Sequence, residues 1–96
     1  MVKLGSRLKA LRKEKNMTQK ALADRLGLAT SAICSYEIGS RYPSYEILIK
    51  IAAIFRVSTD YLLGVEKNRY IDVTDFSEED IEILVMLADS LRKKSH

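Results

Sequence analysis

The stretch from Thr18 to Gly39 reads TQKALADRLGLATSAICSYEIG and contains the signals of two short helices joined by a tight turn. Thr18 is suited to an N-cap, because its hydroxyl can accept a hydrogen bond from an amide of the first turn. The helix that follows, Gln19–Leu26, would bury three apolar side chains, those of Leu22, Ala23 and Leu26. Gly27 favours the left-handed conformation that ends such a helix. Two short helices linked in this way cross at a steep angle, and the small Ala23 permits close contact there.

The second helix of this stretch ends near Gly39, and its two sides differ in character. Ile33 and Tyr36 fall on one side, as expected of residues that face a core. The opposite side carries small or uncharged groups with no evident partner in the chain, namely Ser31, Cys34, Ser35 and Ile38. The residues of this outward side do not by themselves show what it contacts.

Three further helices are indicated around this pair. Leu4, Leu8 and Leu11 have the i, i+4, i+7 spacing of a helix that ends near Asn16. Ser44 is suited to cap a helix from Tyr45 to Phe55, whose many apolar residues predict that it is mostly buried. Ser58 precedes a short helix that contains Tyr61, Leu62 and Leu63, and Gly64 ends this part of the chain.

The last third of the chain has a different organisation. Residues 66–76 lack a helical period and are predicted to form a linker, in which Tyr70–Val73 is compatible with a short strand. Ser77 and the acids that follow it are typical of a helix start, and Arg92, Lys93 and Lys94 suit a helix end. We therefore expect three parts, residues 1–65 as one helical domain, 66–76 as a linker, and 77–96 as a C-terminal helix.

The charge of the chain is divided between these parts. Residues 1–65 carry 11 Lys and Arg against 5 Asp and Glu, a net charge of +6, whereas residues 66–96 carry 5 against 8, a net charge of −3. A basic body with an acidic tail is typical of a polyanion-binding domain that has an appendage with another task.

Several other classes of protein are disfavoured by composition. One cysteine, Cys34, and one histidine, His96, cannot supply a structural metal site within one chain, and no cofactor motif is present. A terminal histidine is also a poor general base, so we expect no enzymatic activity. The most apolar run, Ile47–Phe55, is too short to span a membrane, and we expect a cytoplasmic protein with no membrane partner.

The stretch MTQKALADRLGLATSAICSYEIGSRYPS resembles the lambda-repressor-like helix-turn-helix family of regulators, also called the XRE or Cro type. The positions that match the family pattern are Gln19, Ala23, Gly27, Ile33 and Tyr36. The resemblance covers roughly residues 3 to 64 and implies an all-α fold, a five-helix domain to which the C-terminal helix is added. It also implies an ion pair between Arg12 and Glu37 that ties the first helix to the third.

The family resemblance further implies that the third helix enters the major groove of double-stranded DNA. Thr30, Ser31 and Ser35 match base-facing positions, with Ala32 and Cys34 beside them. Gln19 and Arg41 match positions that contact phosphates. Cys34 is also a candidate redox switch, although a small tolerated residue is the simpler interpretation.

Two departures from the family pattern affect how DNA would be read. Ala29 stands where the family usually has a hydroxyl that caps the third helix, so Thr30 or Ser31 is expected to cap instead. The third helix also lacks Arg, Lys, Asn and Gln, the side chains that make bidentate contacts to bases. We therefore expect more reliance on methyl contacts, including those of Thr30 and Ala32, on water and on DNA shape.

The C-terminal helix lies outside the resemblance and carries surplus apolar residues. Those expected to form a homodimer are Ile81, Leu84, Val85, Leu87, Ala88 and Leu91. A binding site for another protein and a lid on its own domain are the alternatives. The resulting hypothesis is a dimeric, sequence-specific transcriptional repressor that binds an operator. The alternative is a protein-interaction module such as an antitoxin or antirepressor, and the sequence does not identify a small-molecule effector.

Overall fold

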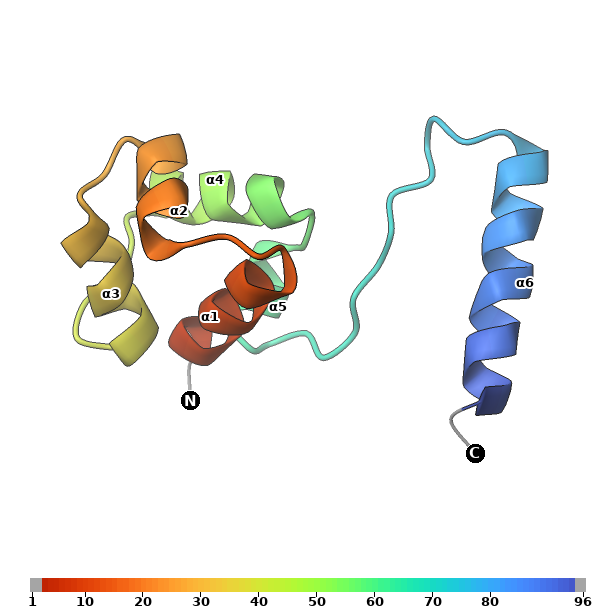
Figure 1. The fold of residues 1–96 in the computed structure, drawn as a ribbon, viewed down its shortest axis with the longest axis horizontal. Helices are drawn as coiled ribbons and strands as arrows, with labels where there is room; N and C mark the ends of the chain where they lie inside the picture. Colours follow the sequence, from red (N-terminus) through yellow and green to blue (C-terminus); the bar gives the residue numbers. More distant parts are fainter. Residues whose placement is uncertain (1–2, 95–96) are drawn as a thin grey trace.

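The computed structural model describes residues 3–94, and within that range it contains helices and no strands (Figure 1). The helices are α1 (Leu4–Glu14), α2 (Gln19–Leu26), α3 (Thr30–Ile38), α4 (Tyr45–Phe55), α5 (Thr59–Leu62) and α6 (Glu78–Lys94). This confirms the predicted all-α fold of five helices followed by a C-terminal helix. His96 and the end of the helix predicted for 77–96 lie outside the described residues.

The helix starts follow the local signals of the sequence. The hydroxyls of Thr18, Ser44 and Ser58 each accept a hydrogen bond from the amide three residues later, at 3.0, 3.2 and 2.9 Å. At the start of α6, the Ser77 hydroxyl accepts from the amide of Asp80, whose carboxylate accepts from the amide of Ser77. This reciprocal pair is a capping box, here with Asp at its last position.

The core lies between α1, α2 and α3 and is closed by one side of α4 and by α5. Its largest fully buried side chains are Leu4, Leu8, Leu22, Ile33, Ile51 and Leu62. Gly5 permits the close approach of α1 and α3, because a Cβ at this position would lie 2.4 Å from the carbonyl oxygen of Glu37. The orientation of α3 therefore depends on a glycine inside a neighbouring helix.

The prediction that α4 is mostly buried is wrong. Its buried residues are Leu48, Ile51, Ala52 and Phe55, which share one side of the helix. Tyr45 and Ile49 lie on the other side and are exposed. The helix packs against the body with one face only, so its high apolar content does not translate into burial on all sides.

The segment between α5 and α6 begins in contact with the body and then departs from it. The guanidinium of Arg7 donates to the carbonyl oxygens of Tyr61 and Glu66 and stacks on the Tyr61 ring, and Arg69 pairs with Glu14 at 3.1 Å. The short strand considered at Tyr70–Val73 does not form. β-branched and aromatic residues favour a strand only where another strand is available for pairing.

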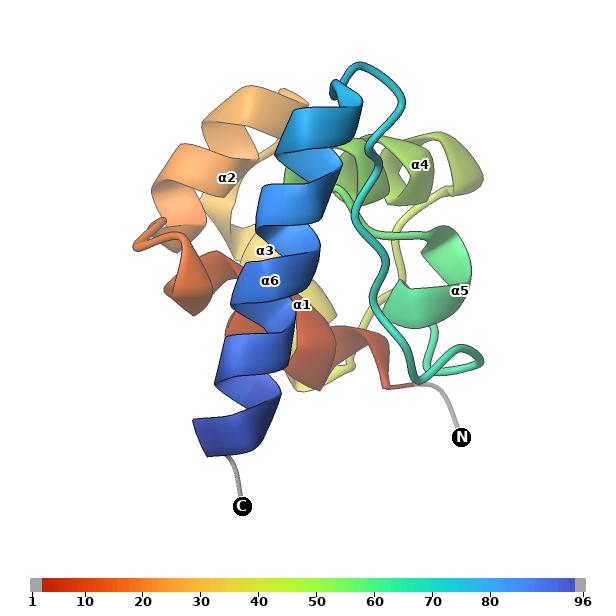
Figure 2. The same ribbon diagram turned by 90° about the vertical axis from the view of Figure 1, so that its right-hand side faces the viewer.

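Figures 1 and 2 show that α6 stands apart from the five-helix body, on the side opposite α3. It therefore does not cover the body as a lid would. Among the described residues, no helix combines the length and apolar character needed to cross a membrane.

Candidate nucleic-acid interface

The turn between α2 and α3 sets the angle at which α3 leaves the body. Gly27 adopts φ 70°, in the left-handed region, as predicted, and the amide of Leu28 donates to the carbonyl of Ala23 at 2.9 Å. Ala23 is fully buried at the contact between the two helices. The turn and the small residue together bring α2 and α3 into the helix-turn-helix arrangement.

The outward face of α3 consists of Thr30, Ser31, Cys34, Ser35 and Ile38. Thr30, Ser31 and Cys34 are exposed, Ser35 is half-buried, and the side chain of Ile38 is 73% exposed. This face carries hydroxyls, one thiol and one large apolar group, without a formal charge.

Ala32 does not belong to this face, contrary to its predicted place among the DNA-facing residues. It is 7% exposed and packs in the core beside Ile33 and Tyr36. Because α3 has nine residues and only one of them is charged, its sequence does not define which positions face the core. In the structure the buried side includes Ala32 as well as the predicted Ile33 and Tyr36. The methyl group of Ala32 is therefore not available to a base.

The cap of α3 also differs from the prediction. Ala29 occupies the N-cap position, and no side chain caps the helix. Neither Thr30 nor Ser31 takes over the role, because both lie inside the first turn, beyond the N-cap. Their hydroxyls are therefore not used for capping, whereas among the first amides of α3 that of Ala32 already donates to the carbonyl of Ala29 at 3.0 Å.

The ion pair implied for Arg12 and Glu37 is present and is nearly buried. Nε and Nη2 of Arg12 donate to the two carboxylate oxygens of Glu37, at 2.7 and 3.1 Å. The Arg12 and Glu37 side chains are 11% and 3% exposed. Nη1 of Arg12 also donates to the carbonyl of Met17 at 2.8 Å, which extends the contact to the start of α2.

The protonation of Glu37 reflects these contacts. Burial raises the pKa of Glu37, but the hydrogen bonds from Arg12 and Gln19 and the charges of Arg12 and Lys9 outweigh it, so the pKa lies below its ordinary value. The hydrogen bond to Glu37 raises the pKa of Arg12, against a smaller effect of burial. The carboxylate therefore stays ionised at neutral pH and holds α1 to α3.

Gln19 lies at the first position of α2, as predicted, and belongs to the same network. Its side-chain amide nitrogen donates to Oε1 of Glu37 at 3.1 Å, and the side chain is half-buried. The structure thus gives Gln19 a positioning contact, in addition to a place at a helix N-terminus where amides attract anions. Sequence reasoning recognised the place but missed the contact.

Arg41 lies in the loop after α3, where its side chain is exposed. The loop is held against the end of α3, because the carbonyl of Ser35 accepts from the amides of Ser40 and Arg41 at 3.0 and 3.4 Å. Arg41 is therefore a cation placed near one end of the outward face.

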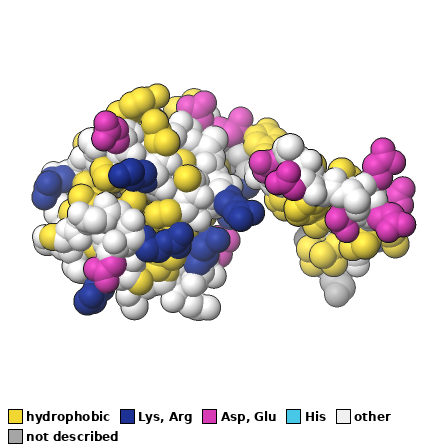
Figure 3. Space-filling view, turned by 90° about the horizontal axis from the view of Figure 1, so that it is seen from above, with side chains coloured by type: hydrophobic (Ala, Val, Ile, Leu, Met, Phe, Trp, Pro, Cys, Tyr) yellow, Lys and Arg dark blue, Asp and Glu magenta, His cyan; other side chains and the backbone are white. Residues whose placement is uncertain are grey.

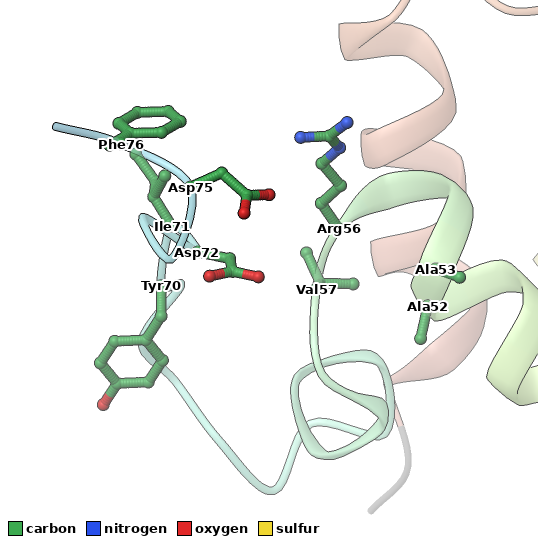
Figure 4. Close-up of a pocket in the computed structure, with 9 residues that line it drawn as sticks. All are labelled: Ala52, Ala53, Arg56, Val57, Tyr70, Ile71, Asp72, Asp75 and Phe76. Atoms are coloured by element: carbon green, nitrogen blue, oxygen red, sulfur yellow. The ribbon is translucent and has the colours of Figure 1, made fainter. Parts of the chain in front are cut away.

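A separate cleft of about 580 Å³ lies between the end of α4 and residues 70–76 (Figure 4). Arg56, the residue after α4, lies across the cleft from Asp72 and Asp75, and Tyr70 and Phe76 also line the cleft. Hydrogen bonds from Thr74 hold the pKa of Asp72 below its ordinary value. The cleft contains no residue of α3 and is not part of the candidate interface.

Comparison with known proteins agrees with this geometry. The helix-turn-helix family matches residues 8–62. The regulator YqaE of Bacillus subtilis, described as an uncharacterized HTH-type transcriptional regulator, is 44% identical over 77 residues, which are 80% of this chain. The matched parts are 63% of YqaE and 61% of another B. subtilis regulator, ImmR, so the chain spans about three fifths of these relatives.

Two solved structures extend the comparison. The P22 c2 repressor in complex with a synthetic operator has a TM-score of 0.62 and 32% identity, and covers 66% of this chain and 96% of its own. A complex of the SinR and SinI proteins has a TM-score of 0.60 and 28% identity, and covers 97% of this chain and 99% of its own. The chain therefore belongs to the helix-turn-helix family of DNA-binding transcriptional regulators, as its resemblance to the lambda-repressor-like proteins predicts.

Proposed function

We propose that this protein is a dimeric repressor that binds a specific double-stranded operator through α3. The observation that carries the proposal is an exposed, uncharged face on a helix whose inner side is fixed by the core and by Glu37. The resemblance to a repressor seen with its operator supports the same assignment. Because the proposed partner is DNA, we assign the protein to the cytoplasm.

The contacts divide into base reading and phosphate binding. Thr30, Ser31 and Ser35 are assigned to base edges, with Cys34 beside them, and Arg41 is assigned to a phosphate. Gln19 combines its contact to Glu37 with a place at the N-terminus of α2, where backbone amides add donors for phosphate.

The dimer is assigned to α6. Its apolar residues Val85, Leu87 and Leu91 are exposed, and Ile81, Leu84 and Ala88 are half-buried. Each fully buried Leu or Ile contributes about 1.5–3 kcal/mol, which together is enough to offset the free energy lost on association. We accordingly assign residues 1–65 to DNA binding, 66–76 to the linker and 77–96 to dimerisation.

A protein-interaction role for α6 is the second candidate. It is favoured by the structural likeness to SinR, which was solved in complex with another protein and which matches the chain through α6. In that case α6 would bind a different chain, and the isolated protein would be a monomer.

Selection of bound DNA from a random pool tests the proposal. We expect a near-palindrome with half-sites separated by one helical turn, about 10–10.5 base pairs, or a multiple of it. Absence of enrichment, or a single asymmetric half-site, contradicts a dimeric repressor.

Two substitutions then separate positioning from reading. Arg41→Ala should weaken binding to all sequences alike and lower the salt dependence by about one phosphate contact, whereas Lys67→Ala in the linker, the matched control, should do neither. Ser35→Ala should leave the salt dependence unchanged and alter preference at one base pair, by at most ~1–3 kcal/mol. A uniform loss for Ser35→Ala with no effect of Arg41→Ala would overturn this docking of α3.

A further inference from the structure

Six apolar residues of α6 are arranged symmetrically along the helix about Met86, whereas Ile83, whose mirror position is Asp89, lies outside this arrangement. Each of three apolar residues before Met86 has an apolar counterpart at the same distance after it. These pairs are Val85 with Leu87, Leu84 with Ala88, and Ile81 with Leu91. With 3.6 residues per turn, these six positions form one broad stripe along the helix. A stripe of this kind presents the same spacing to a second copy that runs in the opposite direction.

The charges of α6 are separated between its two ends. Glu78, Glu79 and Asp80 form the first turn and Glu82 follows them, whereas Arg92 and Lys93 lie near the other end. Figure 3 shows acidic side chains gathered on one part of this helix, beside an exposed apolar surface. In a parallel pair of such helices, like charges would face each other at both ends, whereas an antiparallel pair places opposite charges and opposite helix dipoles side by side.

We propose that the α6 helices of two copies pair in antiparallel orientation, with the two-fold axis of the dimer crossing the stripe at the level of Met86, a residue on the opposite side of the helix. The inference rests on the proposed dimer and specifies its geometry. At each end, Ile81 of one copy lies level with Leu91 of the other. At the centre, Leu84 lies level with Ala88 and Val85 with Leu87, so the apolar stripe is continuous across the interface.

One ion pair at each end of the interface follows from this orientation. Glu78 and Arg92 lie about four turns apart on the same edge of the stripe, so the two-fold axis brings Glu78 of one copy beside Arg92 of the other. Arg92 already contacts Asp89 of its own helix at 3.0 Å, but that pair is exposed and its guanidinium has donors left for a second carboxylate. Glu82 lies on the side away from the stripe and offers a control position.

The orientation also decides where the two linkers leave the dimer. An α6 of 17 residues is about 25 Å long. In the antiparallel pair the two linkers depart from opposite ends, about 25 Å apart, whereas in a parallel pair they depart side by side. Half-sites one helical turn apart are separated by about 34–36 Å, so the antiparallel pair covers most of this distance.

Cysteine cross-linking of the full chain tests the orientation, after sedimentation has established the oligomeric state. With Cys34→Ser as background, we expect Ile81→Cys alone and Leu91→Cys alone to form almost no disulfide-linked dimer, because equal positions would be roughly 15 Å apart along the axis. An equal mixture of the two proteins, and the double variant, should cross-link readily under the same mild oxidation. Efficient self-linking of each single variant would show a parallel pair and overturn the proposal.

Charge reversal gives a second measurement that does not depend on cysteines. Glu78→Arg should weaken dimerisation about tenfold at low salt, and Arg92→Glu combined with it should restore most of the loss. Glu82→Arg has the same change in net charge and should have little effect. Equal losses for Glu78→Arg and Glu82→Arg, or no rescue in the double variant, would refute the pairing.

The outcomes also separate this inference from the proposed function. A wild-type chain that sediments as a monomer at micromolar concentration refutes the dimer itself, and with it the orientation. A stable dimer in which neither the mixture nor the single variants cross-link refutes the stripe as the interface while leaving the dimeric repressor intact.

Discussion

The substitution Glu37→Ala tests whether the ion pair between α1 and α3 holds the DNA-reading helix in place. The Glu37 carboxylate accepts three side-chain hydrogen bonds, two from Arg12 and one from Gln19, and its side chain is 3% exposed. Its removal leaves the guanidinium of Arg12, which is 11% exposed, without its counter-ion. Breaking a buried pair by deleting one partner typically lowers the free energy of unfolding by about 3–5 kcal/mol.

This loss is large compared with the total stability of a chain of this length, about 5–14 kcal/mol at 0.05–0.15 kcal/mol per residue. Urea or thermal unfolding of the full chain measures it directly. Asp24→Ala is the matched control, because the pair between Lys20 and Asp24 is exposed, at 75% and 64%, and contributes at most about 1 kcal/mol. The same loss in both variants would refute a structural role of the buried pair.

A double variant separates the pair from the mere removal of charge. Arg12→Leu with Glu37→Leu removes both ions and leaves no unpaired charge, and replacement of a buried pair by apolar residues is often neutral. We therefore expect the double variant to be more stable than Glu37→Ala. If the double variant were instead less stable than Glu37→Ala, the ion pair itself would make a net favourable contribution to the free energy of unfolding.

Three further predictions follow from particular contacts. Gly5→Ala should lower the free energy of unfolding by about 1–3 kcal/mol and disturb DNA binding, because the added Cβ would meet the backbone of α3. Ala10→Gly in the same helix is the control and should lower it by about 0.5–1 kcal/mol through helix propensity alone. Chemical denaturation compares the two variants. The folded-state pKa of Glu37 lies below its ordinary value of 4.5. The ionised carboxylate therefore stabilises the fold fully above pH 4.5, and this contribution is lost as the pH falls through the folded-state pKa. The free energy of unfolding should consequently fall less steeply on acidification in Glu37→Gln than in the wild type, which unfolding at several pH values can check. Removal of residues 66–96 should leave a folded but monomeric domain with much weaker DNA binding, which light scattering and titration can check, and an unchanged dimer would contradict the role of α6.

The helices and their starts could be predicted from the sequence because their causes are local. Thr18, Ser44, Ser58 and Ser77 each bond to an amide three residues later, and this interaction requires no tertiary contact. The turn at Gly27 is likewise a property of one residue in the left-handed conformation. Signals of this kind are complete within one or two turns of chain.

The errors concern features that depend on distant parts of the chain. Whether Ala32 faces inward is decided by how α3 packs, since a helix composed mainly of small or uncharged residues has a weak polar side of its own. The exposure of Tyr45 and Ile49 follows from α4 having the body on one face only. The role of Gly5 cannot be predicted from the sequence, because a glycine within a helix indicates a close approach only when the neighbouring helix is placed.

The outward face of α3 has a consequence for how specificity is divided in the proposed repressor. Thr30, Ser31 and Ser35 offer hydroxyls, and a hydroxyl can pair with several bases, whereas bidentate side chains distinguish them more sharply. A single half-site would therefore be recognised with modest discrimination. The separation of two half-sites adds a requirement that no single α3 can impose, because the second domain binds only where its half-site lies within reach of the first. In the proposed dimer the α6 pair and its linkers would set this reach, so the acidic tail would contribute to operator choice through the spacing of the two domains.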